Sequence, residues 1–113
     1  MSSEKKIVVL TNCDSRKEAE GIARALVGRG LAACVNVATA PVQSIYRWKG
    51  KVETAKEFLL IIKTSRARYS SVERAIQELH SYDVPEIVAL PIVAGFRAYL
   101  SWLSDSVDGR GRG

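Results

Sequence analysis

The feature that most constrains this chain is the run FLLIIK at 58–63, in which every residue but the last is apolar. We interpret it as the most apolar strand of the chain. Successive side chains of a strand point to opposite faces, so Phe58, Leu60 and Ile62 face one way and the two residues between them face the other. A sheet that contains this strand needs apolar cover on both faces.

Strand and helix signals alternate along the rest of the chain. Ser15 stands three residues before Glu18, the spacing of a capping box that begins a helix, and Gly28 and Gly30 can end that helix. Pro41 interrupts a strand, because it cannot donate to a central ladder. The strand-like segments are 6–10, 31–38, 42–48, 58–63 and 86–92, and the helical ones are 16–30, 66–80 and 96–107.

The order βαββαβ followed by a further helix predicts an α+β fold, a ferredoxin-like sandwich with both main helices on one face of the sheet. We expect a single domain over 1–113, ordered over about 6–107, with a flexible tail at 108–113. The second sheet face is also apolar in several strands, as IVVL and IVAL show. A single chain would expose more apolar surface than soluble monomers tolerate, so we predict that further copies cover it. The pattern alone does not choose a dimer over a trimer.

Composition narrows the function classes. The formal net charge is +5, without a block of five like charges, and no apolar run is long enough to cross a membrane. The first residues also lack the apolar core of a signal peptide, and two cysteines fit a reducing compartment, although one disulfide stays possible. We therefore expect a cytoplasmic protein without a membrane partner.

His80 is the only histidine, and it lies at the end of the second helix. Its imidazole can interact with the helix C-terminus, or it can bind a metal ion or ligand. Donors for a metal are available in Asp83 and Glu86 and in the thiols of Cys13 and Cys34, although none of these residues has the spacing of a known metal motif.

Enzyme and nucleic-acid functions find little support. No glycine-rich phosphate loop follows the first strand, and no serine stands out as the partner of His80 in a catalytic triad. The strand at 58–63 carries one phenylalanine among aliphatic residues, whereas an RNA-recognition module needs stacking aromatics there. We predict a protein that is not an enzyme and does not bind nucleic acid.

A ligand cleft is a further possibility. Ser44, Tyr46 and Trp48 alternate along one strand and therefore share a face. They can form a strand end at an interface or the wall of a cleft. Glu57 and Lys63 share a face of the next strand and could supply the polar groups of such a cleft.

Five ordered segments resemble the CutA divalent-cation tolerance family: LAACVN, SIYRWKGKVETAKEF, IIKT, HSYDVPEIVALPI and YLSWL. The resemblance covers about residues 6–107. It implies a ferredoxin-like subunit in a homotrimer and a likeness to trimeric PII-type signalling proteins, which bind ligands between subunits. It also implies binding of copper or another divalent metal and a part in the response to metal ions.

We predict two groups of site residues from the residues and the resemblance together. The metal residues are His80, Cys13 and Glu86, and the ligand-cleft residues are Trp48, Glu57, Lys63 and Tyr82. The cofactor is Cu(II) or another divalent metal. The alternative is a PII-like trimeric sensor that binds an anionic small molecule without a physiological metal.

The chain departs from the resemblance at the metal site. Some bacterial members have a cysteine near the end of the first strand and two adjacent histidines, where this chain has Thr11 and, before His80, Leu79. Where family members usually have HPY, this chain has HSY at 80–82. A copper site of the cysteine–histidine–histidine type is therefore incomplete here.

Overall fold

The computed structural model describes residues 6–108. Its elements are β1 (Lys6–Cys13), α1 (Arg16–Gly28), β2 (Cys34–Val37), β3 (Val42–Trp48), β4 (Lys51–Ser65), the 3₁₀ turn η2 (Arg66–Arg68), α2 (Tyr69–Leu79), β5 (Val88–Pro91) and α3 (Arg97–Val107). The predicted βαββαβ order with a closing helix is confirmed, with the second strand divided at Pro41 into β2 and β3. The predicted tail lies outside the described residues from position 109 onward.

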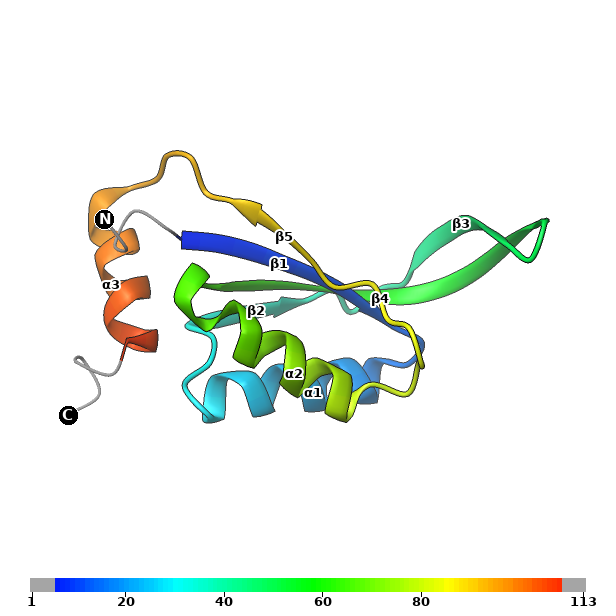
Figure 1. Ribbon diagram of the computed structural model, residues 1–113, viewed down its shortest axis with the longest axis horizontal. Helices are drawn as coiled ribbons and strands as arrows, with labels where there is room; N and C mark the ends of the chain where they lie inside the picture. Colours follow the sequence, from blue (N-terminus) through cyan, green and yellow to red (C-terminus); the bar gives the residue numbers. More distant parts are fainter. Residues whose placement is uncertain (1–5, 109–113) are drawn as a thin grey trace.

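The sheet is antiparallel throughout, in the order β2-β4-β1-β5, and β3 pairs only with β4. Helices α1 and α2 lie on the same face of it (Figure 1). Helix α3 packs at one end of β1 and β4, where Leu103 and Val107 are fully buried. None of the helices in 6–108 is long and apolar enough to span a membrane.

The core lies between the sheet and helices α1 and α2. Its largest fully buried members, apolar and contributed by four elements, are Val9, Ile22, Leu26, Leu60, Ile62, Val72 and Ile76. On β4 the alternate residues Leu59 and Ile61 are half-buried on the opposite face, which leaves that face apolar and without helices over its centre. The two-sided character predicted from FLLIIK is thus confirmed.

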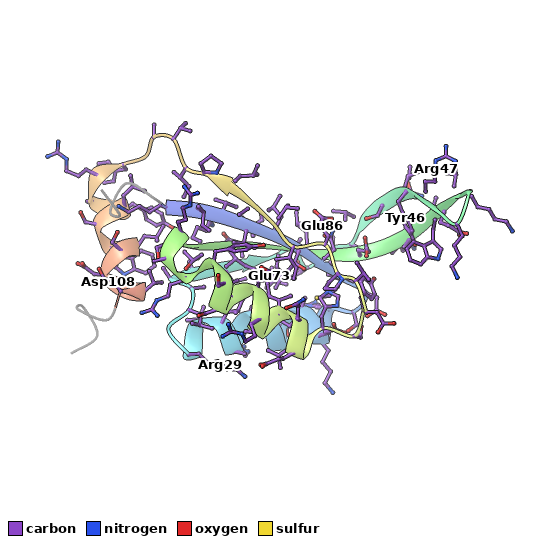
Figure 2. All side chains as sticks on the ribbon, viewed as in Figure 1. Arg29, Tyr46, Arg47, Glu73, Glu86 and Asp108 are labelled. Carbon is purple, nitrogen blue, oxygen red and sulfur yellow. The ribbon has the colours of Figure 1, made fainter. Side chains whose placement is uncertain are left out.

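β3 and the first half of β4 form a two-stranded hairpin that extends away from the body of the molecule (Figure 1). Its turn is Lys49–Gly50, as predicted, and both residues have positive φ, 50° and 80°. Such a turn matches the natural twist of two paired strands. Side chains point outward on both faces of the hairpin, around the labelled Tyr46 and Arg47 (Figure 2). Ile45 is 66% exposed and Val52 is 67% exposed.

Some expected boundaries were wrong. The helix expected over 66–80 begins with the turn η2 and becomes α-helical only at Tyr69, and Ser65 makes no side-chain capping bond. The strands expected over 31–38 and 86–92 are reduced to four residues each. The apolar pattern predicted the faces of these elements but not where their ladders end.

Candidate metal centre

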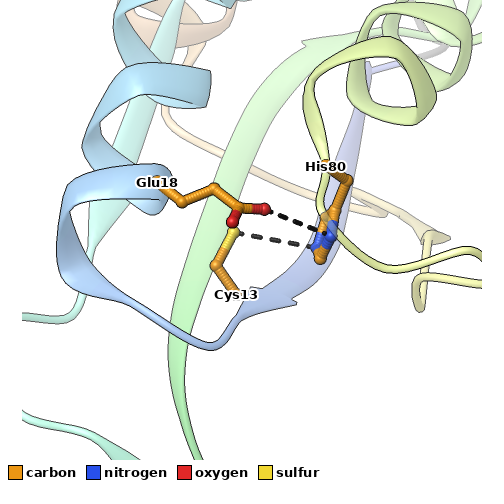
Figure 3. A group of neighbouring side chains, drawn as sticks. All are labelled: Cys13, Glu18 and His80. Atoms are coloured by element: carbon orange, nitrogen blue, oxygen red, sulfur yellow. Dashed lines mark hydrogen bonds and ion pairs between the residues drawn. The ribbon is translucent and has the colours of Figure 1, made fainter.

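Cys13, Glu18 and His80 meet at one end of β1 (Figure 3). Each offers one ligand atom, and the three atoms lie within 4.8 Å of one another. The Cys13 Sγ is 3.7 Å from His80 Nε2, and the Glu18 Oε2 is 3.3 Å from His80 Nδ1. The His80 side chain is fully buried and that of Glu18 is 17% exposed. The fold thus brings together a thiol, a carboxylate and an imidazole from three elements.

Local structure explains why these side chains converge. Cys13 is the last residue of β1 and points to the helix side of the sheet. Ser15 caps α1, since its Oγ accepts a hydrogen bond from the Glu18 amide at 3.1 Å, and this places Glu18 in the first turn. His80 follows the last residue of α2 with an extended backbone, and its amide closes the helix on Ile76 O at 2.8 Å.

Hydrogen bonds fix the tautomer of His80. Its Nε2 lies 2.6 Å from the backbone oxygen of Asn12, which can only accept, so Nε2 carries the proton. Its Nδ1 accepts from the backbone N–H of Tyr82 at 3.1 Å. The Tyr82 ring lies beside the imidazole, with the ring centroids 4.7 Å apart. The imidazole is therefore held in one orientation by two backbone groups.

The thiol of Cys13 is held in its neutral form. Burial raises its pKa from 9.0 to about 12, and the nearby carboxylates of Glu18, Asp14 and Glu57 contribute to the same rise. Cys13, His80 and Glu18 stand in the spatial order of a cysteine triad, but a nucleophilic cysteine needs a lowered pKa and an exposed sulfur. In the folded chain this thiol has neither.

The donor set fits a divalent metal ion with an affinity for sulfur. Thiolate, imidazole and carboxylate are the ligands of zinc, and copper also takes thiolate and imidazole. At zinc–ligand distances of about 2.0–2.3 Å, tetrahedral ligands lie roughly 3.3–3.8 Å apart. The pair of Glu18 Oε2 and His80 Nδ1 matches this at 3.3 Å, whereas the Cys13 Sγ is 3.7 Å from Nε2 and has to move toward Nδ1 to share an ion there. The proton of His80 Nε2 on a backbone carbonyl is the outer-shell hydrogen bond usual for metal-binding histidines.

Three other predicted site residues lie around this centre. Tyr82 donates its hydroxyl to Glu57 Oε2 at 2.8 Å, and burial, followed by this bond, raises the pKa of the Tyr82 hydroxyl. Glu86, which we predicted as a metal residue, accepts instead from the Asn12 side chain at 3.0 Å. It is not a member of the Cys13–Glu18–His80 group.

Lys63 and Trp48 lie away from the centre. Lys63 shares a face of β4 with Glu57, as expected, and its Nζ bonds the side chain of Asn36. Glu57 and Lys63 are six residues apart on an extended strand, so their backbones lie about 20 Å apart. Trp48 is at the hairpin tip, 56% exposed, with the Lys49 ammonium 5.9 Å from the centre of its ring. Within one chain the four cleft residues do not form one cleft.

Sequence reasoning missed Glu18. The capping-box spacing made it a partner of Ser15, but only the Ser15 half of that box forms. The Glu18 carboxylate instead accepts from the Ser81 amide at 2.8 Å. Both cysteines are free thiols. Thr11, which the resemblance aligned with a cysteine of some family members, is buried on the same side of β1 as Cys13. The thiol of this chain lies one pleat further along the same face.

Comparison with known proteins agrees with the fold. The family described as CutA1 divalent ion tolerance protein matches residues 7–106. The divalent-cation tolerance protein CutA of Thermus thermophilus is 46% identical over 99 residues, covering 88% of this chain and 95% of that one. A solved structure of the protein from this organism gives a TM-score of 0.88 at 45% identity, covering 90% of this chain and 98% of that chain.

The names of two further relatives give different cellular locations. A CutA structure from Archaeoglobus fulgidus, described as periplasmic, gives a TM-score of 0.87 at 37% identity over 91% of this chain and 99% of that one. The chloroplastic protein CutA of Arabidopsis thaliana is 41% identical, covering 88% of this chain and 54% of that one. The cytoplasmic location expected for this chain therefore stays a prediction.

The described part of this α+β chain, with its antiparallel sheet and helices α1, α2 and α3, matches these solved structures, which cover about nine-tenths of the chain. The chain belongs to the CutA1 divalent ion tolerance family.

Proposed function

We propose that this protein is a trimeric divalent-cation tolerance protein that binds copper or a similar divalent ion and takes part in the response to metal ions. The observation that carries the proposal is the approach of Cys13, Glu18 and His80 ligand atoms to within 4.8 Å. When bound, the metal supplies a positive charge that stabilises the Cys13 thiolate. Cys13, Glu18 and His80 bind it, and the Asn12 carbonyl orients the imidazole.

Metal titration by calorimetry tests this assignment. Untagged protein is titrated with Zn(II) and, without oxygen, with Cu(II), alongside Cys13→Ser, Glu18→Gln and His80→Ala. Loss of a group that only orients a ligand costs roughly 10–100-fold in metal affinity, so loss of a ligand costs at least about 100-fold. Glu86→Gln tests the set predicted from sequence, and Glu20→Gln, whose carboxylate bonds Arg16 and not the three ligands, is the matched control.

The outcomes separate the alternatives. Equal binding by wild type and the three ligand variants would overturn the site. Weakened binding by Cys13→Ser, His80→Ala and Glu86→Gln, with Glu18→Gln binding like wild type, would favour the set predicted from sequence. Binding of a nucleotide or another anionic metabolite, without any metal binding, would favour a PII-like small-molecule sensor.

The trimer is proposed from the apolar surface that one chain leaves bare. The open face of the sheet carries Leu10, Leu59 and Ile61, and the hairpin exposes Ile45 and Val52. A two-stranded hairpin is marginally stable in water on its own, and covering these side chains against other copies stabilises it. The family resemblance selects three copies.

Light scattering tests the number of copies. Three chains of 12.4 kDa make about 37 kDa. We expect that mass for wild type and for Gln77→Asp, a control on the exposed face of α2. Ile45→Asp introduces a charge into the proposed interface and lowers the mass toward 12.4 kDa. A wild-type particle of one chain at micromolar concentration would contradict the trimer.

A further inference from the structure

The turn that follows α2 is tied to the metal centre by its own backbone. The Ser81 amide donates to Glu18 Oε2 at 2.8 Å, and the Tyr82 amide donates to His80 Nδ1 at 3.1 Å. Two successive backbone N–H groups therefore bond the atoms that would face a cation. These amides supply partial positive charge at the centre.

Other polar contacts hold the rest of this turn, residues 81–86. Tyr82 bonds Glu57 at 2.8 Å, and Glu86 bonds Asn12 at 3.0 Å. The turn buries little apolar surface, since Val84 is 82% exposed. A segment with few apolar contacts opens at low cost once its hydrogen bonds are lost. Its order thus depends on these contacts.

The imidazole can serve only one partner at Nδ1. Nε2 keeps its proton on the Asn12 carbonyl, which leaves Nδ1 as the nitrogen with a free electron pair. That single pair lies in the ring plane, and it accepts the Tyr82 N–H. A metal ion at Nδ1 and the Tyr82 hydrogen bond exclude each other. Glu18 has a second oxygen, so its bond with Ser81 is not excluded in the same way.

We propose that metal binding at His80 Nδ1 displaces the Tyr82 amide and releases the 81–86 turn, including the bond between Tyr82 and Glu57. This inference rests on the proposed function. Glu57 faces Val42, the first residue of β3, in the last ladder pair of the hairpin. Release of Tyr82 frees the Glu57 carboxylate at the point where the hairpin joins the body. Occupancy of the metal centre is thereby transmitted to the base of the hairpin.

The single histidine makes the first test unambiguous. In untagged protein with ¹⁵N-labelled histidine, only two ring-nitrogen resonances are present, both from His80. Saturating Zn(II) should shift Nδ1 strongly and leave Nε2 protonated. Hydrogen exchange at the Tyr82 amide should accelerate at least about tenfold, because its hydrogen bond is lost. The His80 amide, bonded to Ile76 O at 2.8 Å, is the internal control and should not change.

The results of that experiment distinguish the release of the turn from the metal site itself. Zinc binding with coordination through Nε2, or with an unchanged Tyr82 amide, overturns the release of the turn and leaves the metal site intact. Absence of zinc binding overturns the proposed function together with this inference. Acceleration at both the His80 and Tyr82 amides would mean that α2 frays generally, which also contradicts a specific displacement.

A conservative variant tests the link to Glu57. Tyr82→Phe keeps the ring beside His80 and removes the hydroxyl that bonds Glu57. If metal binding breaks that bond, its removal should tighten Zn(II) binding about 2- to 10-fold, the equivalent of one ordinary hydrogen bond. Tyr99→Phe on α3 is the control and should bind like wild type. Unchanged or weaker binding by Tyr82→Phe would overturn the coupling.

Discussion

The body of the molecule and the hairpin carry similar side chains in different surroundings. In the body Ile62 is fully buried beneath the helices, whereas in the hairpin Ile45 and Val52, on paired strands, are about two-thirds exposed. Both regions form regular antiparallel ladders. The comparison shows that strand formation and burial are separate outcomes. The chain covers one face of its body with helices α1 and α2 (Figure 1) and leaves the side chains of the hairpin bare.

The largest expected effect comes from an identical truncation in both regions. Ile62→Ala opens a cavity in the core and should lower the free energy of unfolding by about 2–5 kcal/mol. Ile45→Ala removes an exposed side chain and should cost a single chain under about 0.5 kcal/mol. Urea denaturation at several protein concentrations measures both. If Ile45 lies at an interface, the Ile45→Ala substitution weakens association. The urea midpoint of this variant should then depend more strongly on protein concentration than that of wild type.

Alkaline pH should weaken the body of the molecule, where Cys13 is buried. The folded chain holds the Cys13 pKa at about 12 against 9.0 as reference, so above pH 9 the unfolded state binds fewer protons and stability falls as pH rises. The slope is at most about 1.4 kcal/mol per pH unit from this group. Denaturation at pH values of about 8, 9.5 and 10.5 measures it. Cys13→Ser should flatten the decline, and an unchanged slope in that variant would contradict the role of the thiol.

Loss of the α1 cap should have a smaller effect. Ser15→Ala leaves the Glu18 amide without its acceptor and should cost about 1 kcal/mol in unfolding free energy. Because the same cap orients Glu18, Zn(II) affinity should fall as well. Ser44→Ala in the hairpin is a serine control that has no part in a helix cap. Comparable losses from both substitutions would contradict the distinction between the two regions.

The smallest expected effect is spectroscopic. Trp48 is 56% exposed in a single chain, so in a Trp102→Phe background its fluorescence should be readily quenched by acrylamide if the hairpin is bare. In a trimer that covers the hairpin, quenching should be weaker and should rise with Ile45→Asp. Equal quenching with and without that substitution would place Trp48 outside the interface.

The apolar periodicity predicted much of the body. The alternation in 58–63 indicated both faces of β4, and Pro41 marked the break between β2 and β3. Lys49 and Gly50 marked the turn of the hairpin. These features depend on local backbone sterics and on the two-residue alternation of side chains in a strand. Both can be predicted from the local sequence.

The metal centre was predicted only in part, for a physical reason. The imidazole and thiol were named from their chemistry, but the separation of 67 positions between Cys13 and His80 carries no spacing signal. The approach of Glu18 depends on where α2 ends relative to α1, and local propensity does not determine that packing. The capping-box pattern was the available signal that Glu18 stands beside the end of β1.

β4 runs through both regions as one unbroken strand of 15 residues. One edge of it is paired with β1 in the body, and in the hairpin it is paired with β3. Side chains in a strand alternate strictly, so inserting a single residue near Phe58 would invert every position beyond it relative to those before. β4 therefore sets the register of both ladders at once. A substitution along β4 acts at its own position, whereas an insertion or deletion in one region misaligns the other.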